Sequence, residues 1–330
     1  MIILSGSSHA KLAFNIANLL QTKPIPCVLD KFSDGEIQVD IKENIRNQDI
    51  FIIQSGYSNN NENYTTNDYL METLILIDAC KRSMAKSINL IMPYYPYSRQ
   101  DKKDESRSPI TAKLVANMLT QSGIDRLVVM DLHSSQIQGF FDIPVDNIYS
   151  VNLVIEYFNK NIFNTFTEDE KDEKFIIISP DAGAVKRTLK FAKCMGLDTA
   201  ILHKQRNYQK KNTIEKSMII GDPDCLKNKT AIICDDMCDT GGTLIKSIEI
   251  LTENGVKDVI VVVTHGILSG EAINKINDCK YITKMIVTNS VDQTRNITIS
   301  NKLDIIPIDN LMSQVINCLN TSESISQLFN

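Results

Sequence analysis

Hydrophobic and polar positions along the chain follow two alternating patterns. Short apolar runs, such as residues 175–178 and 259–263, are typical of strands buried on both faces of a parallel sheet. Between such runs, apolar residues recur at helical spacing, as in residues 70–84 and 110–119, which predicts amphipathic helices. Alternating strands and helices indicate an α/β protein with parallel sheets, and the layout occurs twice, which indicates two similar domains.

Two polar stretches interrupt this layout. The Asn-rich residues 58–67 and the charge run at 167–174 both predict solvated loops. We place the domain boundary near residue 150, so that residues 1–149 form the first domain and residues 150–310 the second. We expect the C-terminal helix, within residues 311–330, to join the first domain.

Composition narrows the class of protein. With 330 residues, 43% of them hydrophobic and 23% charged, the chain has the make-up of an ordinary globular protein. A net charge of -5 argues against a general nucleic-acid binder, and no apolar run approaches the roughly 20 residues of a membrane span. None of the eight cysteines forms a Cys-x-x-Cys pair, which argues against a zinc site and favours a reducing, cytoplasmic setting.

The most informative stretch is residues 230–244. A short apolar strand leads to acidic residues, then to Gly241-Gly242 and the start of a helix. The glycines let the backbone approach a ligand, and helix N-terminal amides bind phosphate. No Lys follows the glycines, so this is not the Walker loop. The acids either accept hydrogen bonds from sugar hydroxyls or face a divalent metal; the alternative is an ordinary turn with solvated acids at Asp235, Asp236 and Asp239.

Three other segments have more than one interpretation. Residues 94–107 hold three tyrosines and then mixed charges, so they are either a surface loop or a nucleotide pocket. Asp131 and His133 alternate at the carboxyl end of a predicted strand, which favours one shared face and a cation or phosphate site; the alternative is a buried His with a satisfied partner. Residues 5–8, Ser-Gly-Ser-Ser, are either a phosphate-binding turn or a strand-to-helix turn with an N-cap Ser.

These motifs together resemble those of a known family. Residues 235–243, Asp-Asp-Met-Cys-Asp-Thr-Gly-Gly-Thr, resemble the phosphoribosyl pyrophosphate (PRPP) loop of phosphoribosyltransferases and PRPP synthetases. A phosphoribosyltransferase would have one such domain and a base-binding hood, so the first half of the chain favours a PRPP synthetase. A non-catalytic associated regulatory subunit is the other alternative, although the intact motifs argue against it. The segments that carry the resemblance to PRPP synthetases are residues 5–9, 32–36, 98–103, 109–116, 130–133, 136–144 and 179–183.

The resemblance implies a fold and an activity. It implies two similar doubly wound parallel-sheet domains of phosphoribosyltransferase type, the first binding ATP and the second ribose 5-phosphate. The β,γ-diphosphoryl group of ATP would pass to the anomeric hydroxyl of ribose 5-phosphate, giving PRPP and AMP for nucleotide biosynthesis. It also implies Mg²⁺ as cofactor, inorganic phosphate as activator, and a cytoplasmic homo-hexamer built from dimers, without nucleic-acid or membrane partners.

The resemblance also implies roles for individual residues. Lys204 and Arg206 would lie on a flexible catalytic loop. The ATP-binding residues would be Phe32, Asp34, Glu36, Arg99, Gln100, Asp104 and Arg107. The metal ligands would be His133 and Asp181, with Asp131, Asp142 and Asp146. Ribose 5-phosphate would bind Asp235, Asp236, Asp239, Thr240, Gly241, Gly242 and Thr243. A regulatory anion would bind Arg46, Ser135, Ser324 and Ser326.

Overall fold

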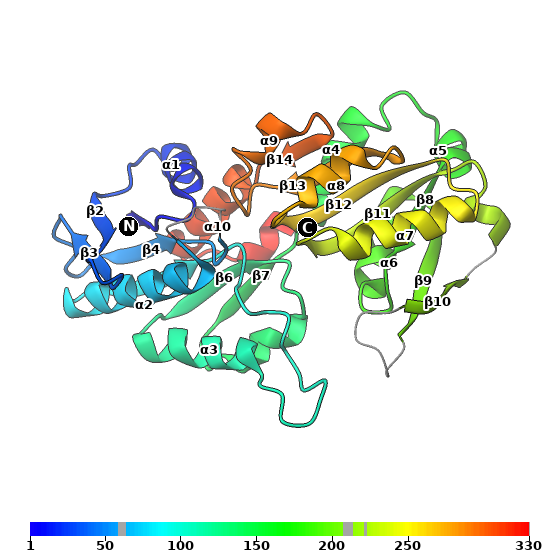
Figure 1. The fold of residues 1–330 in the computed structure, drawn as a ribbon. Helices are drawn as coiled ribbons and strands as arrows, with labels where there is room; N and C mark the ends of the chain where they lie inside the picture. The colour runs from blue at the N-terminus through cyan, green and yellow to red at the C-terminus, as the bar shows by residue number, and fades with distance from the viewer. Residues whose placement is uncertain (59–63, 207–213, 221–222, 330) are drawn as a thin grey trace. The chain divides into compact units, whose positions relative to one another are not determined.

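The computed structural model describes residues 1–58, 64–206, 214–220 and 223–329, with side chains other than those of 203–206, 214–218 and 223. The chain folds as two compact units (Figure 1). Unit 1 comprises Met1–Tyr149, Asn289–Asp292 and Pro307–Asn330, and unit 2 comprises Ser150–Thr288 and Gln293–Ile306. Residues 289–292 and 307–310, which the sequence placed in the second domain, therefore belong to unit 1.

The main sheet of unit 1 is parallel, as the apolar runs predicted. Helices α2 (Thr66–Arg82) and α3 (Thr111–Ser122) share a buried core with alternate residues of its strands, including Ile50 and Leu127. The intervening residues, such as Phe51 and Val128, are also buried, so both faces are covered. In sheet order, the strands are β1 (Ile2–Ser5), β4 (Asp49–Ile53), β5 (Ser87–Ile91), β6 (Arg126–Met130) and β7 (Val145–Ile148).

Smaller elements complete unit 1. Helix α1 (Ala10–Leu19) packs against α10 (Asp309–Thr321), and Asn15 donates a hydrogen bond to Asp309 at 2.7 Å. An antiparallel hairpin turns at Gly35, whose φ of +93° suits glycine. The hairpin strands are β2 (Cys27–Lys31) and β3 (Ile37–Ile41), and the short 3₁₀ helices are η1 (Ser135–Phe140) and η3 (Ile325–Phe329).

Hydrogen bonds explain why residues 289–292 belong to unit 1. The His9 Nε2 atom lies 2.8 Å from the carbonyl oxygen of Asn289, and the Ser55 hydroxyl donates to Ser290 O at 2.6 Å. The Asp292 N–H donates to the Tyr57 hydroxyl at 2.7 Å. Buried polar groups must find partners, and this segment provides them within unit 1.

The sheet of unit 2 is parallel except for one antiparallel pair, β9–β10. Strand β13 lies between β12 and β14, inside the sheet. In sheet order, the strands are β10 (Ile214–Ile220), β9 (Thr199–Arg206), β8 (Phe175–Ser179), β11 (Thr230–Cys238), β12 (Asp258–Gly266), β13 (Ile282–Thr288) and β14 (Leu303–Ile306).

Helices cover both faces of this sheet, as a doubly wound fold requires. Buried residues of α4 and α6 share a core with Ile177 and Ile232, whereas those of α7 and α8 share one with Ile178 and Ile233. The strand order reverses at β8, which has β9 on one side and β11 on the other. Ligands bind outside the carboxyl ends of strands at such a switch point. The helices of unit 2 are α4 (Val151–Asn161), α5 (Glu168–Lys174), α6 (Val185–Met195), α7 (Gly242–Glu253), α8 (Ala272–Asp278) and α9 (Asn296–Ile299), with the 3₁₀ helix η2 (Pro223–Leu226).

Two predicted loops are partly helical. The charge run forms α5 because Thr167 and Glu170 make a capping box: the Glu170 N–H donates to the Thr167 hydroxyl, and the Glu170 carboxylate accepts from the Thr167 N–H at 2.8 Å. In the Asn-rich stretch, residues 66 and 67 begin α2, and residues 59–63 lie outside the described chain. Across the described ranges, we find no helix that is both long and apolar enough to span a membrane.

Candidate functional site

The paired acids of unit 2 lie within β11, not after it. Strand β11 continues to Cys238 because its pairing with β12 continues, with Asp235 opposite Val263 and Cys238 opposite Gly266. Asp236 is buried, with its side chain 5% exposed, whereas that of Asp235 is 32% exposed. The Asp236 N–H donates to Asp235 Oδ1 at 2.8 Å. Both acids therefore lie at the carboxyl end of β11, beside the switch point.

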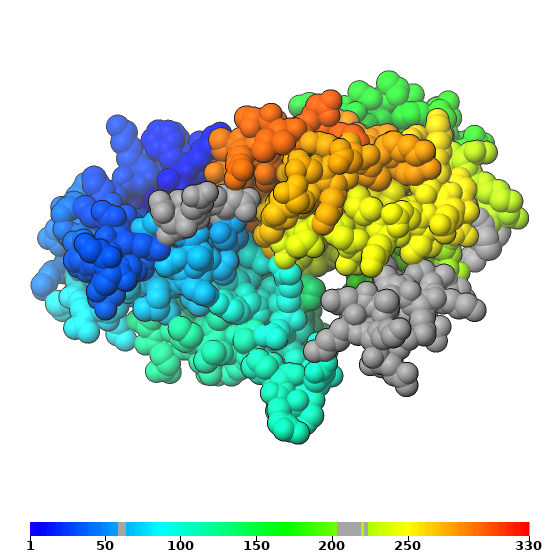
Figure 2. Space-filling model, in the orientation of Figure 1, coloured from blue at the N-terminus to red at the C-terminus, as the bar shows by residue number. Residues whose placement is uncertain are grey.

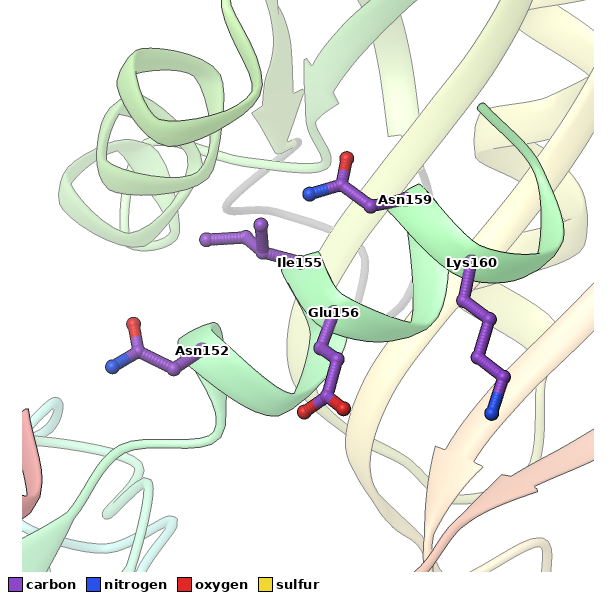
Figure 3. Close-up of a pocket in the computed structure, with 5 residues that line it drawn as sticks. All are labelled: Asn152, Ile155, Glu156, Asn159 and Lys160. Carbon is purple, nitrogen blue, oxygen red and sulfur yellow. The ribbon is translucent and has the colours of Figure 1, made fainter. Parts of the chain in front are cut away.

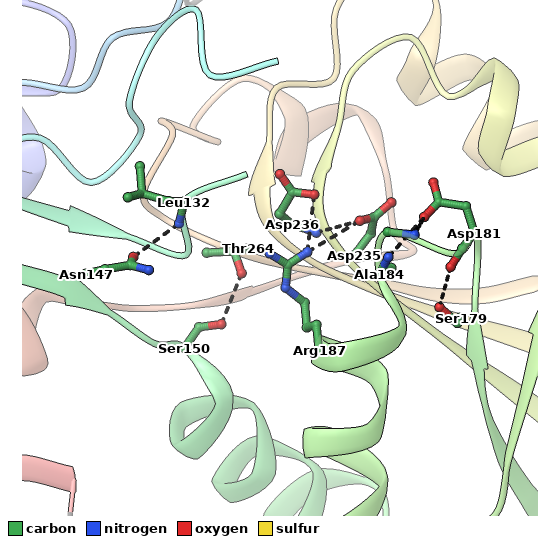
Figure 4. A network of polar contacts seen from close by, with 11 residues as sticks. Leu132, Asn147, Ser150, Ser179, Asp181, Ala184, Arg187, Asp235, Asp236 and Thr264 are labelled. Atoms are coloured by element: carbon green, nitrogen blue, oxygen red, sulfur yellow. Dashed lines mark hydrogen bonds and ion pairs between the residues drawn. The ribbon is translucent and has the colours of Figure 1, made fainter. Parts of the chain in front are cut away.

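A guanidinium that the sequence did not point to lies against both acids. Arg187, in the first turn of α6, places its Nη1 atom 3.2 Å from Asp236 Oδ1 and 3.5 Å from Asp235 Oδ1 (Figure 4). Asp181 shapes the preceding loop, because its Oδ1 atom accepts from the N–H groups of Gly183 at 2.8 Å and Ala184 at 3.0 Å. The loop after β8 and the end of β11 thus bring three acids and an arginine to one edge of unit 2.

This arrangement changes the acidity of one carboxyl. Burial is the main cause that raises the pKa of Asp235 well above its ordinary value, and the neighbouring Asp236 carboxylate adds to the rise. Arg187 opposes it. Burial also raises the pKa of Cys234 and Cys238 to about 12, so these thiols stay protonated and unreactive.

The glycine turn after β11 has the geometry that a phosphate cradle needs. Gly241 has a φ of +72° and precedes α7 as its N-cap. A Cβ on Gly242 would meet no atom within 4 Å, so the space beside this first helical residue is open. Neighbours hold the turn's carbonyls, since Lys275 Nζ donates to Thr240 O at 3.0 Å and the Ser269 N–H donates to Asp239 O at 3.1 Å.

The expected ATP-binding residues of unit 1 lie on two segments. At the hairpin turn, Phe32 is 51% exposed, and Asp34 accepts from the Glu36 N–H at 3.1 Å. The hairpin contacts the first turn of α2 through an ion pair of 2.9 Å between Lys31 and Asp68. The other segment is the loop between β5 and α3, which projects from the surface (Figure 2). Its expected residues, Arg99, Gln100, Asp104 and Arg107, are all exposed.

The tyrosines of this loop do not match the nucleotide-pocket interpretation. Tyr94 and Tyr95 are buried, and the Tyr95 hydroxyl donates to Ala112 O at 2.9 Å. Tyr97 is 39% exposed and donates to Asn67 in the first turn of α2. Two of the three rings therefore pack in the core instead of facing a base, and the nucleotide interpretation depends on the charged residues that follow.

Two expected metal ligands of unit 1, Asp142 and Asp146, lie toward the amino-terminal ends of the sheet strands, away from Asp131. Asp146, within β7, accepts a hydrogen bond from Arg126 at 2.6 Å, and Asp142 precedes that strand. Arg126 is the first residue of β6, whereas Asp131 directly follows β6. Because β6 and β7 are parallel, the chain returns to the amino-terminal ends of the strands between them, and it has done so before Asp142. The structure does not bring Asp142 and Asp146 to Asp131.

Asp131 and His133 do not alternate on a strand, contrary to the prediction. Strand β6 ends at Met130, and Asp131 has a φ of +38°, so the chain turns there. Asp131 is buried and its N–H donates to Ile148 O at 2.9 Å, whereas His133 is exposed. Among the described side chains, no three His, Cys, Asp or Glu residues gather into a group able to hold a metal. Mg²⁺ is typically bound by one or two carboxylates with water and substrate phosphates, so these acids fit it without a closed cage.

The Ser5–Ser8 turn does not present its amides to a ligand. The Ser7 N–H donates to the buried Glu72 carboxylate at 2.8 Å, and the Ser8 N–H donates to Gln54 at 3.0 Å. The N-cap of α1 is His9, so the predicted N-cap Ser is wrong. The turn is therefore part of the core of unit 1.

The remaining expected residues can be placed but not joined into a site. Strand β9 includes the backbones of Lys204 and Arg206, opposite Ser217 and Ile214 of β10, and their side chains lie outside the described part. The four candidates for a regulatory anion are exposed on three separate segments of unit 1. Arg46 precedes β4, Ser135 begins η1, Ser324 precedes η3, and Ser326 lies within η3.

A shallow pocket of about 630 Å³ lies elsewhere in unit 2 (Figure 3). One helix, α4, provides its lining, and no predicted site residue belongs to it. None of the glycine turn, the paired acids and the switch point contributes to the lining of this pocket. The lining residues are Asn152, Ile155, Glu156, Asn159 and Lys160.

Comparison with known proteins gives matches along the whole chain. The family model described as the N-terminal domain of ribose phosphate pyrophosphokinase matches residues 1–123, and the phosphoribosyl synthetase-associated domain matches residues 217–330. Ribose-phosphate pyrophosphokinase 2 of Schizosaccharomyces pombe is 42% identical, over 99% of this chain and 96% of the relative. Ribose-phosphate pyrophosphokinase A of Dictyostelium discoideum is 43% identical, over 99% and 97%. The crystal structure of phosphoribosylpyrophosphate synthetase from Mycobacterium smegmatis has a TM-score of 0.86 and 37% identity, and the match covers 97% of this chain and 99% of that chain.

Proposed function

Because the chain belongs to the ribose-phosphate pyrophosphokinase family, whose reaction forms PRPP, we propose that it transfers the β,γ-diphosphoryl group of ATP to ribose 5-phosphate. One observation of this structure carries the proposal. The carboxyl end of β11 places paired carboxylates beside a glycine turn at a helix N-terminus, which suits a sugar that carries a phosphate.

Unit 2 would bind ribose 5-phosphate. Asp235 and Asp236 would accept hydrogen bonds from the ribose hydroxyls, with Asp239 beside them. The 5-phosphate would lie on the turn, where the open space beside Gly242 leaves room for it. The residues of the turn are Asp239, Thr240, Gly241, Gly242 and Thr243.

Unit 1 would bind ATP through the hairpin turn and the loop after β5. Both segments contact the first turn of α2, through Lys31 and Tyr97. Arginine matches phosphate oxygens with two parallel hydrogen bonds, so Arg99 and Arg107 suit the triphosphate. Family resemblance assigns Phe32, Asp34 and Glu36 to the adenine, and Gln100 and Asp104 to the same nucleotide.

The reaction needs positioning and charge neutralisation more than covalent help. The anomeric hydroxyl loses its proton to solvent as its oxygen bonds to the β-phosphorus. The bond from that phosphorus to the oxygen bridging to the α-phosphate breaks, and AMP leaves with the bridging oxygen. We assign Lys204 and Arg206 to stabilising the charge on the transferring group. In unit 1, the residues that would hold Mg²⁺ are Asp131 and His133. In unit 2, the metal ligand would be Asp181. When bound, Mg²⁺ neutralises and orients phosphate oxygens.

Assembly and regulation are also part of the proposal. We propose a homo-hexamer built from dimers, in which a neighbouring subunit completes the adenine site, and activation by inorganic phosphate. Arg46, Ser135, Ser324 and Ser326 are exposed polar groups that an anion can reach. The eight cysteines are free thiols, which suits a reducing, cytoplasmic compartment.

AMP formation from ATP, measured with and without ribose 5-phosphate in Mg²⁺ and phosphate, tests the activity. We expect AMP only when ribose 5-phosphate is present. No AMP from folded protein would move the interpretation to a non-catalytic regulatory subunit. Consumption of PRPP with a nucleobase, without ATP, would instead indicate a phosphoribosyltransferase.

A further inference from the structure

The first turn of α6 places a cation where the proposed sugar site has two adjacent acids. Arg187 lies 3.2 Å from Asp236 and 3.5 Å from Asp235, and its side chain is 21% exposed. Two carboxylates this close repel each other unless a cation or a shared proton intervenes. Arg187 is the cation that the structure provides to both.

The elements behind Arg187 keep it in place. Helix α6 packs into the unit 2 core through Phe191 and Ala192, so its first turn has a defined position relative to β11. Strands β8 and β11 pair in parallel up to Ile178 and Ile233, which places the start of α6 beside the acids. The Nη1 atom of Arg187 contacts one oxygen of each acid. A planar guanidinium holds this nitrogen more rigidly than the flexible stem of a lysine holds its ammonium.

We propose that Arg187 is a positioning residue for ribose 5-phosphate, whose guanidinium holds Asp235 and Asp236 as adjacent, oriented acceptors for the sugar hydroxyls. The proposal rests on the sugar-binding role proposed above for these two acids. A sugar diol needs acceptors in a fixed arrangement, and removing the partner that contacts both acids loosens their orientation relative to each other. Arg187 acts through the acids, so its loss affects the sugar and not the nucleotide.

Steady-state kinetics of three variants test this. Arg187→Gln removes the cation, Arg187→Lys keeps the charge without the fork, and Lys193→Gln removes an exposed charge from the last turn of the same helix. A hydrogen bond to a charged group contributes enough to binding that we expect Arg187→Gln to raise the KM for ribose 5-phosphate by about tenfold to a hundredfold. The KM for ATP stays the same, Arg187→Lys recovers part of the loss, and Lys193→Gln resembles the wild type.

A further variant separates the two proposals. Asp236→Asn must raise the KM for ribose 5-phosphate; if it does not, the proposed sugar site is wrong. If it does, while folded Arg187→Gln and Arg187→Lys keep wild-type KM values for both substrates, the role of Arg187 alone is wrong. Equal increases in the KM for ribose 5-phosphate and the KM for ATP would indicate general structural damage and would also overturn the proposed role of Arg187. If Arg187→Gln does not fold, Arg187→Lys decides by the same criterion.

Discussion

The side-chain amine of Lys275 donates a hydrogen bond to the carbonyl oxygen of Thr240, over a distance of 3.0 Å. Lys275 lies on α8, and Thr240 lies in the turn between β11 and α7. The contact therefore ties the turn to α8, a helix about thirty residues further along the chain. It also brings a positive charge to the place where we propose that a phosphate binds.

Replacing Lys275 should weaken sugar phosphate binding. We expect Lys275→Gln to raise the KM for ribose 5-phosphate by about threefold to tenfold, because one hydrogen bond and a nearby charge are lost. The KM for ATP should not change, and the KM increase should shrink at high salt. Lys257→Gln is the matched control, since Lys257 is an exposed lysine just before β12, at the opposite end of the strands from the glycine turn. A rise of equal size in that control would contradict this role.

The two glycines of the turn should respond differently to alanine. Gly241 has a positive φ, so Gly241→Ala should lower the free energy of unfolding by about 1 kcal/mol or more. Gly242→Ala adds a methyl group into open space at the start of a helix, so stability should be unchanged while the KM for ribose 5-phosphate rises. Urea unfolding and steady-state kinetics measure both. A Gly242→Ala protein with wild-type kinetics would show that no ligand approaches that residue.

The raised pKa of Asp235 predicts a dependence of stability on pH. The carboxyl ionises more readily in the unfolded chain, so ionisation favours unfolding as the pH rises above the unfolded-state value of about 3.9. Asp235→Asn should therefore raise the Tm at pH 7, and the gain should shrink toward pH 4. The same variant should bind ribose 5-phosphate less well. A Tm at pH 7 equal to or below that of the wild type would show that this carboxyl does not cost stability.

Loss of Lys204 should affect the reaction more than binding. We expect Lys204→Ala to lower kcat by about 10²–10³, the usual effect of removing one donor that stabilises transition-state charge. ATP affinity, measured by equilibrium titration, should change little. An equal fall in ATP affinity would assign Lys204 to nucleotide binding instead.

Local patterns in the sequence predicted much of the fold and part of the site. Apolar runs such as 259–263 became parallel strands, because residues buried on both faces of a sheet need no alternation. Asp235 and Asp236 could be found because they share a short stretch with the glycine turn. The capping box at Thr167 and Glu170 is a local pattern that the loop prediction for the charge run missed, and it outweighs the polarity of that run.

Features that depend on tertiary structure could not be predicted in this way. Arg187 and Lys275 reach the site from helices whose positions follow from packing, and neither lies within the motif around β11. Asp146 is close to Asp131 in sequence. Because β6 and β7 are parallel, however, the chain returns to the amino-terminal ends of the strands, where Asp146 pairs with Arg126. Spacing along a chain does not show such a reversal.

The fate of labelled phosphorus tests the central claim most directly. The protein would be incubated with ribose 5-phosphate, Mg²⁺, phosphate and ATP labelled at either the α- or the β-phosphorus. Transfer of the diphosphoryl group predicts that the β label appears in PRPP and the α label in AMP, in equal amounts. A β label that stays with the nucleotide as ADP would contradict the account.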